Sequence, residues 1–191
     1  ISMYTTSHFI WISLYSKYFA DIFSWIQNIL WPDCSSIIEL QNPLSLHITI
    51  FYLPSKISPQ DKEVIHKILW QIWEVKLDFS ISNMKYFWEW ENLRVGYIGI
   101  QNDIQLRTFH ASCKNLFPQY MDIPDNAYPI FIPHITLFRI KNIPAFLEKK
   151  WVIEQFIAHE LVSVQNINLA ESWRLFAVNS RFTPELQMII S

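Results

Sequence analysis

Apolar residues along the chain recur at two periods, and these periods predict a series of strands and helices. Residues 8–15 read HFIWISLY, an aromatic and β-branched run that is typical of a buried strand. In residues 18–30 and 59–74 the apolar side chains recur every three or four positions with polar ones opposite, which predicts two helices. The same criteria predict strands at 36–41, 46–53, 76–90, 93–101, 134–140, 157–170 and 173–180, and helices at 104–118 and 144–155.

The helix at 59–74 carries the clearest start signal. Ser58 is placed to be its N-cap, and Pro59 suits the first helical position. Asp61 then completes a start of the capping-box kind. We therefore expect this helix to begin at Pro59.

The order of the predicted elements gives the fold class. Strand, helix, strand and strand follow one another and then roughly repeat, which predicts an α+β protein with two sheet-bearing lobes. With 191 residues, of which 51% are apolar and 17% charged, the chain can bury a sizeable core. The apolar run 8–31 is interrupted by Lys17 and Asp21, so we expect it to lie in that core rather than in a membrane.

Composition and charge exclude several classes of function. Lys and Arg number 15 against 17 Asp and Glu, so we expect no basic surface for long nucleic acid, whereas a small anionic ligand still fits. Two cysteines are too few for a disulfide framework or a thiolate metal site, which favours a reducing, cytoplasmic location. With only Gly96 and Gly99, the chain has neither a P-loop nor a dinucleotide fingerprint.

A five-residue pattern occurs twice in the chain. Residues 47–51 read HITIF and residues 134–138 read HITLF, and both lie in predicted strands. Successive strand side chains point to opposite faces, so the His, Thr and Phe of each copy share one face and the aliphatic residues share the other. Helices can cover the aliphatic face. We therefore expect the His and Thr face of both copies to line a polar cleft.

The residue types in this pattern suit the cleavage of a phosphodiester. In-line cleavage needs a base for the attacking oxygen and an acid for the leaving oxygen. Histidine titrates near pH 6.5, so His47 and His134 can supply one of each. The hydroxyls of Thr49 and Thr136 can donate to the phosphate oxygens and stabilise the charge that develops there. This chemistry needs no metal or cofactor, and the spacing of His and acidic residues predicts no metal site.

The two motifs, 87 residues apart (134 − 47), and the order of the strands resemble the 2H phosphoesterase superfamily, which includes the 2′-5′ RNA ligase-like RNA cyclic phosphodiesterases. Pro133, directly before the second motif, adds to the resemblance. It implies one bilobal α+β domain over residues 1–191, with two antiparallel-rich sheets facing a central cleft and helices outside. It also implies metal-independent hydrolysis, with His47 and His134 as acid and base and with Thr49 and Thr136 binding phosphate.

Several further residues are candidates for the site. Some members of the superfamily carry a basic residue just after the second motif, where this chain has Arg139. By strict alternation Arg139 points away from His134, so its contact with phosphate requires a β-bulge or the strand end. His110 lies on the apolar stripe of its predicted helix, so we expect it in the core or at its edge. Candidates for stacking on a base are Phe51, Phe138, Tyr128 and Phe131, followed by Trp88 and Trp90.

The leading hypothesis is an enzyme that opens a 2′,3′-cyclic phosphate on a nucleotide or RNA end to a 2′-phosphate. A second keeps this chemistry but acts on 2′-5′ linked oligonucleotides or on cyclic nucleotide or dinucleotide signals. A third is a nucleotide-binding module without turnover. A fourth is a structural domain in which the two motif histidines do not converge. For the enzyme we expect a monomer whose partner is a small nucleotide or RNA end, with no membrane, metal or cofactor.

Overall fold

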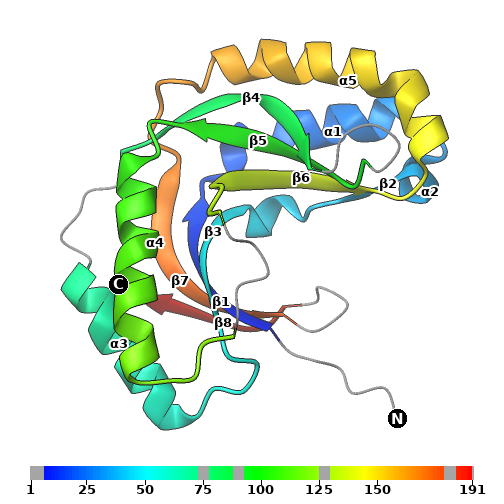
Figure 1. The fold of residues 1–191 in the computed structure, drawn as a ribbon. Coiled ribbons are helices and arrows are strands. Elements are labelled where there is room, and N and C mark those ends of the chain that lie inside the picture. The colour runs from blue at the N-terminus through cyan, green and yellow to red at the C-terminus, as the bar shows by residue number, and fades with distance from the viewer. Residues whose placement is uncertain (1–6, 73–77, 88–92, 125–129, 179–183, 191) are drawn as a thin grey trace, which may run out of the picture.

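Two four-stranded antiparallel sheets form the framework of the protein (Figure 1). The computed structural model describes residues 7–72, 78–87, 93–124, 130–178 and 184–190. The first sheet contains, in spatial order, β3 (His47–Leu53), β1 (Ser7–Leu14), β7 (Ala170–Val178) and β8 (Pro184–Ile190). The second sheet contains β2 (Ile38–Leu40), β6 (His134–Ile140), β5 (Val95–Gln101) and β4 (Ser80–Phe87).

Helices cover the outer face of each sheet, as Figure 1 shows. The helical segments are η1 (Ser16–Tyr18), α1 (Ala20–Ile29), α2 (Cys34–Ile37), η2 (Pro43–Ser45), α3 (Pro59–Ile72), α4 (Ile104–Leu116), η4 (Phe117–Gln119) and α5 (Ile143–Val162). Helix α4 packs against β3, and α3 packs against α4. Helix α5 packs against β4 and α1, where the rings of Trp25 and Phe156 stack with centroids 3.6 Å apart. The α+β fold with two sheets and outer helices is therefore confirmed.

The two motif strands lie where the sheets meet. Strand β3 forms an edge of the first sheet, and it contacts β6 of the second sheet. On its other side β6 pairs with the short β2 only over residues 138–140, so β2 does not reach the end of β6 that carries His134. The fold thus brings both His-x-Thr motifs to one junction.

Each motif strand contains a β-bulge at the fourth residue of its pattern. On β3 the extra residue is Ile50, because its neighbours Thr49 and Phe51 pair with adjacent residues of β1. On β6 the extra residue is Leu137, because its neighbours Thr136 and Phe138 pair with adjacent residues of β5. A bulge reverses the alternation of the residues that follow it. Side chains beyond Ile50 and Leu137 therefore point to the face opposite to the one that strict alternation gives.

The bulges place both motif phenylalanines in the core, so the prediction that they lie on the cleft face is wrong. Phe51 is 1% exposed and stacks on Phe117 with ring centroids 5.4 Å apart. Phe138 is fully buried and packs against Phe146 of α5, also at 5.4 Å. Strict alternation fails here because each strand gains one residue before the phenylalanine.

The predicted helix start at Pro59 is confirmed. The backbone N–H of Asp61 donates to the Ser58 hydroxyl over 3.1 Å, and the N–H of Ser58 donates to the Asp61 carboxylate over 2.8 Å. These two bonds form the reciprocal capping box, which satisfies two backbone donors at the start of α3. The short 3-10 and α segments η1 and α2 were not predicted.

The C-terminal third differs from the sequence prediction. Residues 143–162 form the single helix α5, whereas a short helix at 144–155 and a strand from 157 were expected. Phe156, Ile157 and Leu161 are spaced for a helix as well as for a buried strand, and they pack inward from α5. The last two strands lie at 170–178 and 184–190. In the described part of the chain, no helix combines the length and apolar character that crossing a bilayer demands.

Gly96 leaves space for the ring of Phe138, which the bulge turns into the core. A substitution at Gly96 therefore tests the β6 bulge. Gly96 pairs with Phe138, and a Cβ atom at position 96 would lie 2.5 Å from that ring and 2.8 Å from the methyl of Met84. Gly96→Ala should therefore lower the free energy of unfolding by about 1–3 kcal/mol, measured by urea denaturation. Phe138→Leu should cost less in the Gly96→Ala background than in the wild type. A Gly96→Ala variant as stable as the wild type would contradict this packing.

Candidate active site

Both motif histidines are anchored in the same way. The Nδ1 atom of His47 lies 2.7 Å from the carbonyl oxygen of Ser45, and Nδ1 of His134 lies 2.7 Å from that of Ile132. Because a carbonyl oxygen only accepts, Nδ1 carries the hydrogen in each ring. In the neutral imidazole Nε2 is then the acceptor, which is the atom that can take a proton from a substrate or water.

His47 is enclosed by aromatic side chains of β1. The centroid of the Trp11 ring lies 4.6 Å from the imidazole centroid, and that of Phe9 lies 5.5 Å from it. Trp11 is fully buried, and these two residues form a small apolar cluster separate from the main core. In the first lobe, the aromatic rings of Phe9 and Trp11 therefore pack around the imidazole of His47.

His134 has a similar but more open setting in the second sheet. Phe87 of β4 and Tyr97 of β5 contact the imidazole with centroids 4.8 and 5.3 Å away, and they stack on each other at 4.2 Å. The hydrogen bond from His134 to Ile132 is exposed, whereas the one from His47 to Ser45 is part-buried. The two rings therefore differ in how completely water is excluded from them.

The pKa values of His47 and His134 reflect this difference in burial. Burial lowers the pKa of His47 to about 4, against the opposing effect of its bond to Ser45, and the charge of His134 lowers it further. Burial also lowers the pKa of His134, its bond to Ile132 raises it, and the Arg139 guanidinium lowers it. The charge of His134 lowers the pKa of His47, so the two imidazoles lie within electrostatic range of each other.

A cavity of about 350 Å³ opens beside the motifs. Strand β3 contributes Thr49 and Tyr52 to its lining, and β6 contributes His134, Thr136 and Arg139. His47 stands two residues before Thr49, on the same face of β3, and both are half-buried. The cavity therefore has hydroxyls from both lobes at its wall, with an imidazole and a guanidinium beside them.

Arg139 reaches the cavity because of the bulge at Leu137. The same bulge on β3 brings Tyr52 to the cavity, at the position of the first motif that corresponds to Arg139. Tyr52 is 44% exposed, and its ring centroid lies 5.9 Å from that of Phe9. Tyr52 was not predicted, although it follows His47 by the same number of residues as Arg139 follows His134.

The loop before the second motif forms another wall. Phe131 lines the cavity, and its ring lies parallel to the His110 imidazole of α4, with centroids 4.2 Å apart and 1° between the planes. His110 lies at the edge of the core, as expected, but it also lines the cavity, which its helical spacing alone did not indicate. The other aromatic candidates, Tyr128, Trp88 and Trp90, lie outside the described residues.

The aromatic residues that contact the two histidines were not predicted, because they come from other strands. Phe9 and Trp11 share one face of β1 by simple alternation, but only the pairing of β1 with β3 places that face against His47. Phe87 and Tyr97 depend in the same way on the ladders of the second sheet. Within the described ranges, no three His, Cys, Asp or Glu side chains gather in a way that could hold a metal ion.

Comparisons with known proteins agree with this fold. The family model described as AKAP7 2′5′ RNA ligase-like domain matches residues 6–169. A search of curated proteins finds no match. Among solved structures, TT0787 of Thermus thermophilus has a TM-score of 0.63 and 15% identity, over 96% of this chain and 97% of that one.

Two further solved structures have the same fold at low sequence identity. LigT of E. coli, complexed with 3′-AMP, has a TM-score of 0.54 and 14% identity, over 98% of this chain and 99% of that one. Usb1 of Kluyveromyces marxianus has a TM-score of 0.54 and 11% identity, over 96% and 97%. At these identities the structures show the fold, whereas the family model spans most of the chain. The chain belongs to the AKAP7 2′5′ RNA ligase-like domain family, within the 2H phosphoesterase superfamily.

Proposed function

We propose that the protein is a metal-independent phosphodiesterase that opens 2′,3′-cyclic phosphates of nucleotides or RNA ends to 2′-phosphates. One observation carries the proposal: each lobe supplies an imidazole whose Nδ1 hydrogen is donated to a backbone carbonyl, which leaves Nε2 for proton transfer. The two imidazoles interact electrostatically, and threonine hydroxyls from both motifs line the adjacent cavity. This is the arrangement that acid–base cleavage of one phosphodiester requires.

In the proposed reaction a water molecule attacks phosphorus opposite the 3′-oxygen. One imidazole takes a proton from the water as the new P–O bond forms. The other imidazole gives a proton to the 3′-oxygen as the P–O3′ bond breaks. The products are a 2′-phosphomonoester and a free 3′-hydroxyl, and the two histidines have exchanged protonation states.

The different surroundings of the histidines support one assignment of the two roles. His47 has the more strongly lowered pKa, so it is neutral at neutral pH and acts as the base. His134 keeps the higher pKa of the two, and a bound phosphate anion beside it would raise that pKa and favour the protonated acid. Arg139 would then offset its unfavourable effect on His134 by binding the same phosphate.

The nucleoside side of the cavity is aromatic. Tyr52 and Phe131 both line it and can stack on a base. A volume of about 350 Å³ lies at the lower end of the range of about 300–1,000 Å³ that is usual for ligand pockets, which favours a ligand of about one nucleotide. Two structural neighbours were solved with ligands of this size, LigT with 3′-AMP and Usb1 with uridine monophosphate.

The first prediction concerns the substrate. In the presence of EDTA the protein should convert 2′,3′-cyclic nucleotides to 2′-phosphates, measured by chromatography against both phosphate isomers. The double variant His47→Ala, His134→Ala should lose this activity entirely within detection, because neither proton transfer remains. The panel should also contain a cyclic-phosphate-ended RNA, a 2′-5′ oligoadenylate and cyclic dinucleotides. Exclusive cleavage of one of the last two would replace the proposed substrate, and turnover by the double variant would overturn the mechanism.

The second prediction concerns pH. His47 has to be neutral, so kcat/KM should fall as the pH drops through about 4. His134 has to be protonated, so kcat/KM should also fall as the pH rises through a pKa below the ordinary 6.5. Arg139→Gln removes a charge that lowers the pKa of His134, so only the alkaline limb should move, toward higher pH. An alkaline limb that stays in place would contradict the assignment of His134 as the acid.

The third prediction concerns the hydroxyls. Thr136→Val keeps the shape of the side chain but removes its donor, and kcat/KM should fall about 10²–10³-fold if the hydroxyl stabilises the transition-state phosphate. Thr136→Ser is the matched control, because it keeps the hydroxyl, and it should retain most of the activity. Equal activity of the Val and Ser variants in a steady-state assay would show that Thr136 does not act on the phosphate.

A further inference from the structure

We propose that Arg107 and His110, which lie one turn apart on α4, are positioning residues that hold the two histidine motifs in place relative to each other. The inference rests on the proposed function, because it concerns the geometry of the same two imidazoles. It adds a part to the site that neither motif contains. A single turn of one helix binds the backbone of both motif segments.

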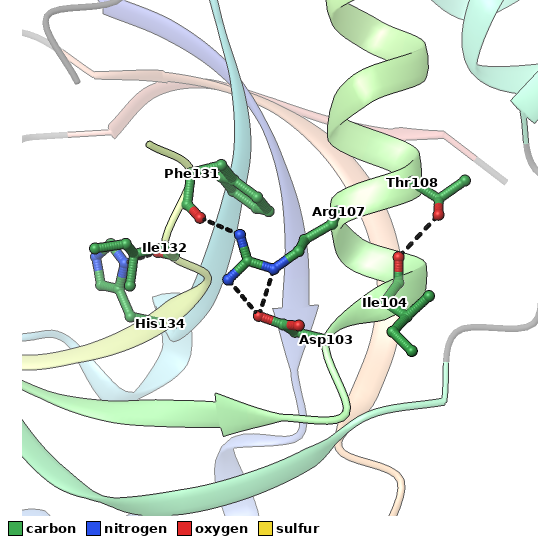
Figure 2. Close-up of polar contacts among 7 residues, drawn as sticks. All are labelled: Asp103, Ile104, Arg107, Thr108, Phe131, Ile132 and His134. Carbon is green, nitrogen blue, oxygen red and sulfur yellow. Dashed lines mark hydrogen bonds and ion pairs between the residues drawn. The ribbon is translucent and has the colours of Figure 1, made fainter. Parts of the chain in front are cut away.

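Arg107 holds the segment that anchors His134. Its Nη1 donates to the carbonyl of Phe131 over 2.8 Å, while Nη2 and Nε lie 2.7 and 2.9 Å from one carboxylate oxygen of Asp103. Figure 2 shows the guanidinium between Asp103 and the chain at Phe131. The next carbonyl along the chain, that of Ile132, accepts the Nδ1 hydrogen of His134. Arg107 thus fixes the peptide directly before the anchor of the second histidine.

His110 holds the other motif. Its Nδ1 lies 2.7 Å from the carbonyl of Ile50, the extra residue of the β3 bulge, directly after Thr49. Its ring also stacks on Phe131, so the same imidazole contacts both motif segments. The bond thus fixes the carbonyl of the residue that the bulge adds to β3.

The carbonyls of Ser45 and Ile132, which accept the Nδ1 hydrogens of His47 and His134, depend on contacts from α4 to different degrees. Ser45, which anchors His47, ends the turn η2, and this turn is held by local bonds from Leu44 to the Asn42 side chain and from the Ser45 hydroxyl to the Asn42 carbonyl. Phe131 and Ile132 lie outside any helix or strand. The position of the second anchor therefore depends on contacts from a distant element, and α4 supplies them.

Small shifts of the anchors matter because proton transfer depends steeply on distance. A displacement of about 1 Å at a reacting group can cost about 10²-fold in rate. Loss of either α4 contact would let one imidazole move relative to the other without removing any group that binds phosphate. We therefore expect the main loss in kcat, with a smaller rise in KM from any shift of Phe131, which we propose stacks on the base.

The experiment compares Arg107→Met, which keeps the aliphatic stem but removes all donors, with Arg107→Lys, which keeps one charged donor. His110→Phe keeps the stack on Phe131 but removes the bond to Ile50. Thr108→Ala is the matched control, because Thr108 lies between them on α4 and only bonds its hydroxyl to the Ile104 carbonyl over 2.9 Å (Figure 2). With 2′,3′-cyclic nucleotides, Arg107→Met and His110→Phe should lose about 10–100-fold in kcat. Arg107→Lys should recover part of the loss, and Thr108→Ala should match the wild type.

A second readout does not depend on turnover. In ¹⁵N NMR of labelled histidines, assigned with a His134→Gln variant, the wild type should show a protected Nδ1–H on His134. In Arg107→Met this hydrogen should exchange faster, and the pKa of His134 should fall, because its bond to Ile132 raises that pKa. Arg139, the neighbouring charge that acts on this pKa, is unchanged in the variant.

The outcomes separate the two proposals. A wild type that cleaves nothing, with the NMR change present, would overturn the proposed function but leave the positioning role intact. An active wild type whose Arg107→Met and His110→Phe variants keep both kcat and the His134 signal would overturn the positioning role alone. Equal losses in Thr108→Ala and Arg107→Met would also overturn it, since the effect would then be general to α4.

Discussion

Both motif strands interrupt the regular alternation of strand side chains at the fourth residue of the pattern, and the layout of the site follows from these two bulges. The bulges at Ile50 and Leu137 turn the phenylalanine of each motif into the core and the residue after it into the cleft. Without them Tyr52 and Arg139 would be buried and two bulky rings would fill the cavity. One extra residue per strand thus converts a symmetric apolar repeat into a pocket with a cation on one side and an aromatic ring on the other.

The near-identity of the motifs does not make the histidines equivalent. In both rings the Nδ1–H donates to the carbonyl two residues earlier, so Nε2 is left as the acceptor in both lobes. Their neighbours differ, because Phe9 and Trp11 shield His47 more fully than Phe87 and Tyr97 shield His134. In the proposed reaction, base and acid would therefore arise from the same five-residue pattern, and the surrounding strands would decide which histidine takes which role.

The sequence was enough to predict the α+β class, the two motif strands and the start of α3 at Pro59, because periodicity and caps are local signals. The bulges were not predictable from one strand alone, since the extra residue is defined only against a pairing partner. Phe51 and Phe138 were misplaced for that reason. The aromatic walls around the histidines come from strands distant in sequence, so their place depends on sheet order. The apolar run after Trp151 fits a strand as well as a helix, and tertiary packing resolves it into α5.

In the proposed function, His47 and His134 act on one phosphate. The most direct measurement follows both imidazoles by ¹⁵N NMR while a nucleoside 2′-phosphate is titrated into the protein. We predict that the Nε2 signals of both histidines shift together, with one ligand per chain and with uptake of a proton by His134. A ligand that binds at this stoichiometry but moves the signal of only one histidine would contradict it.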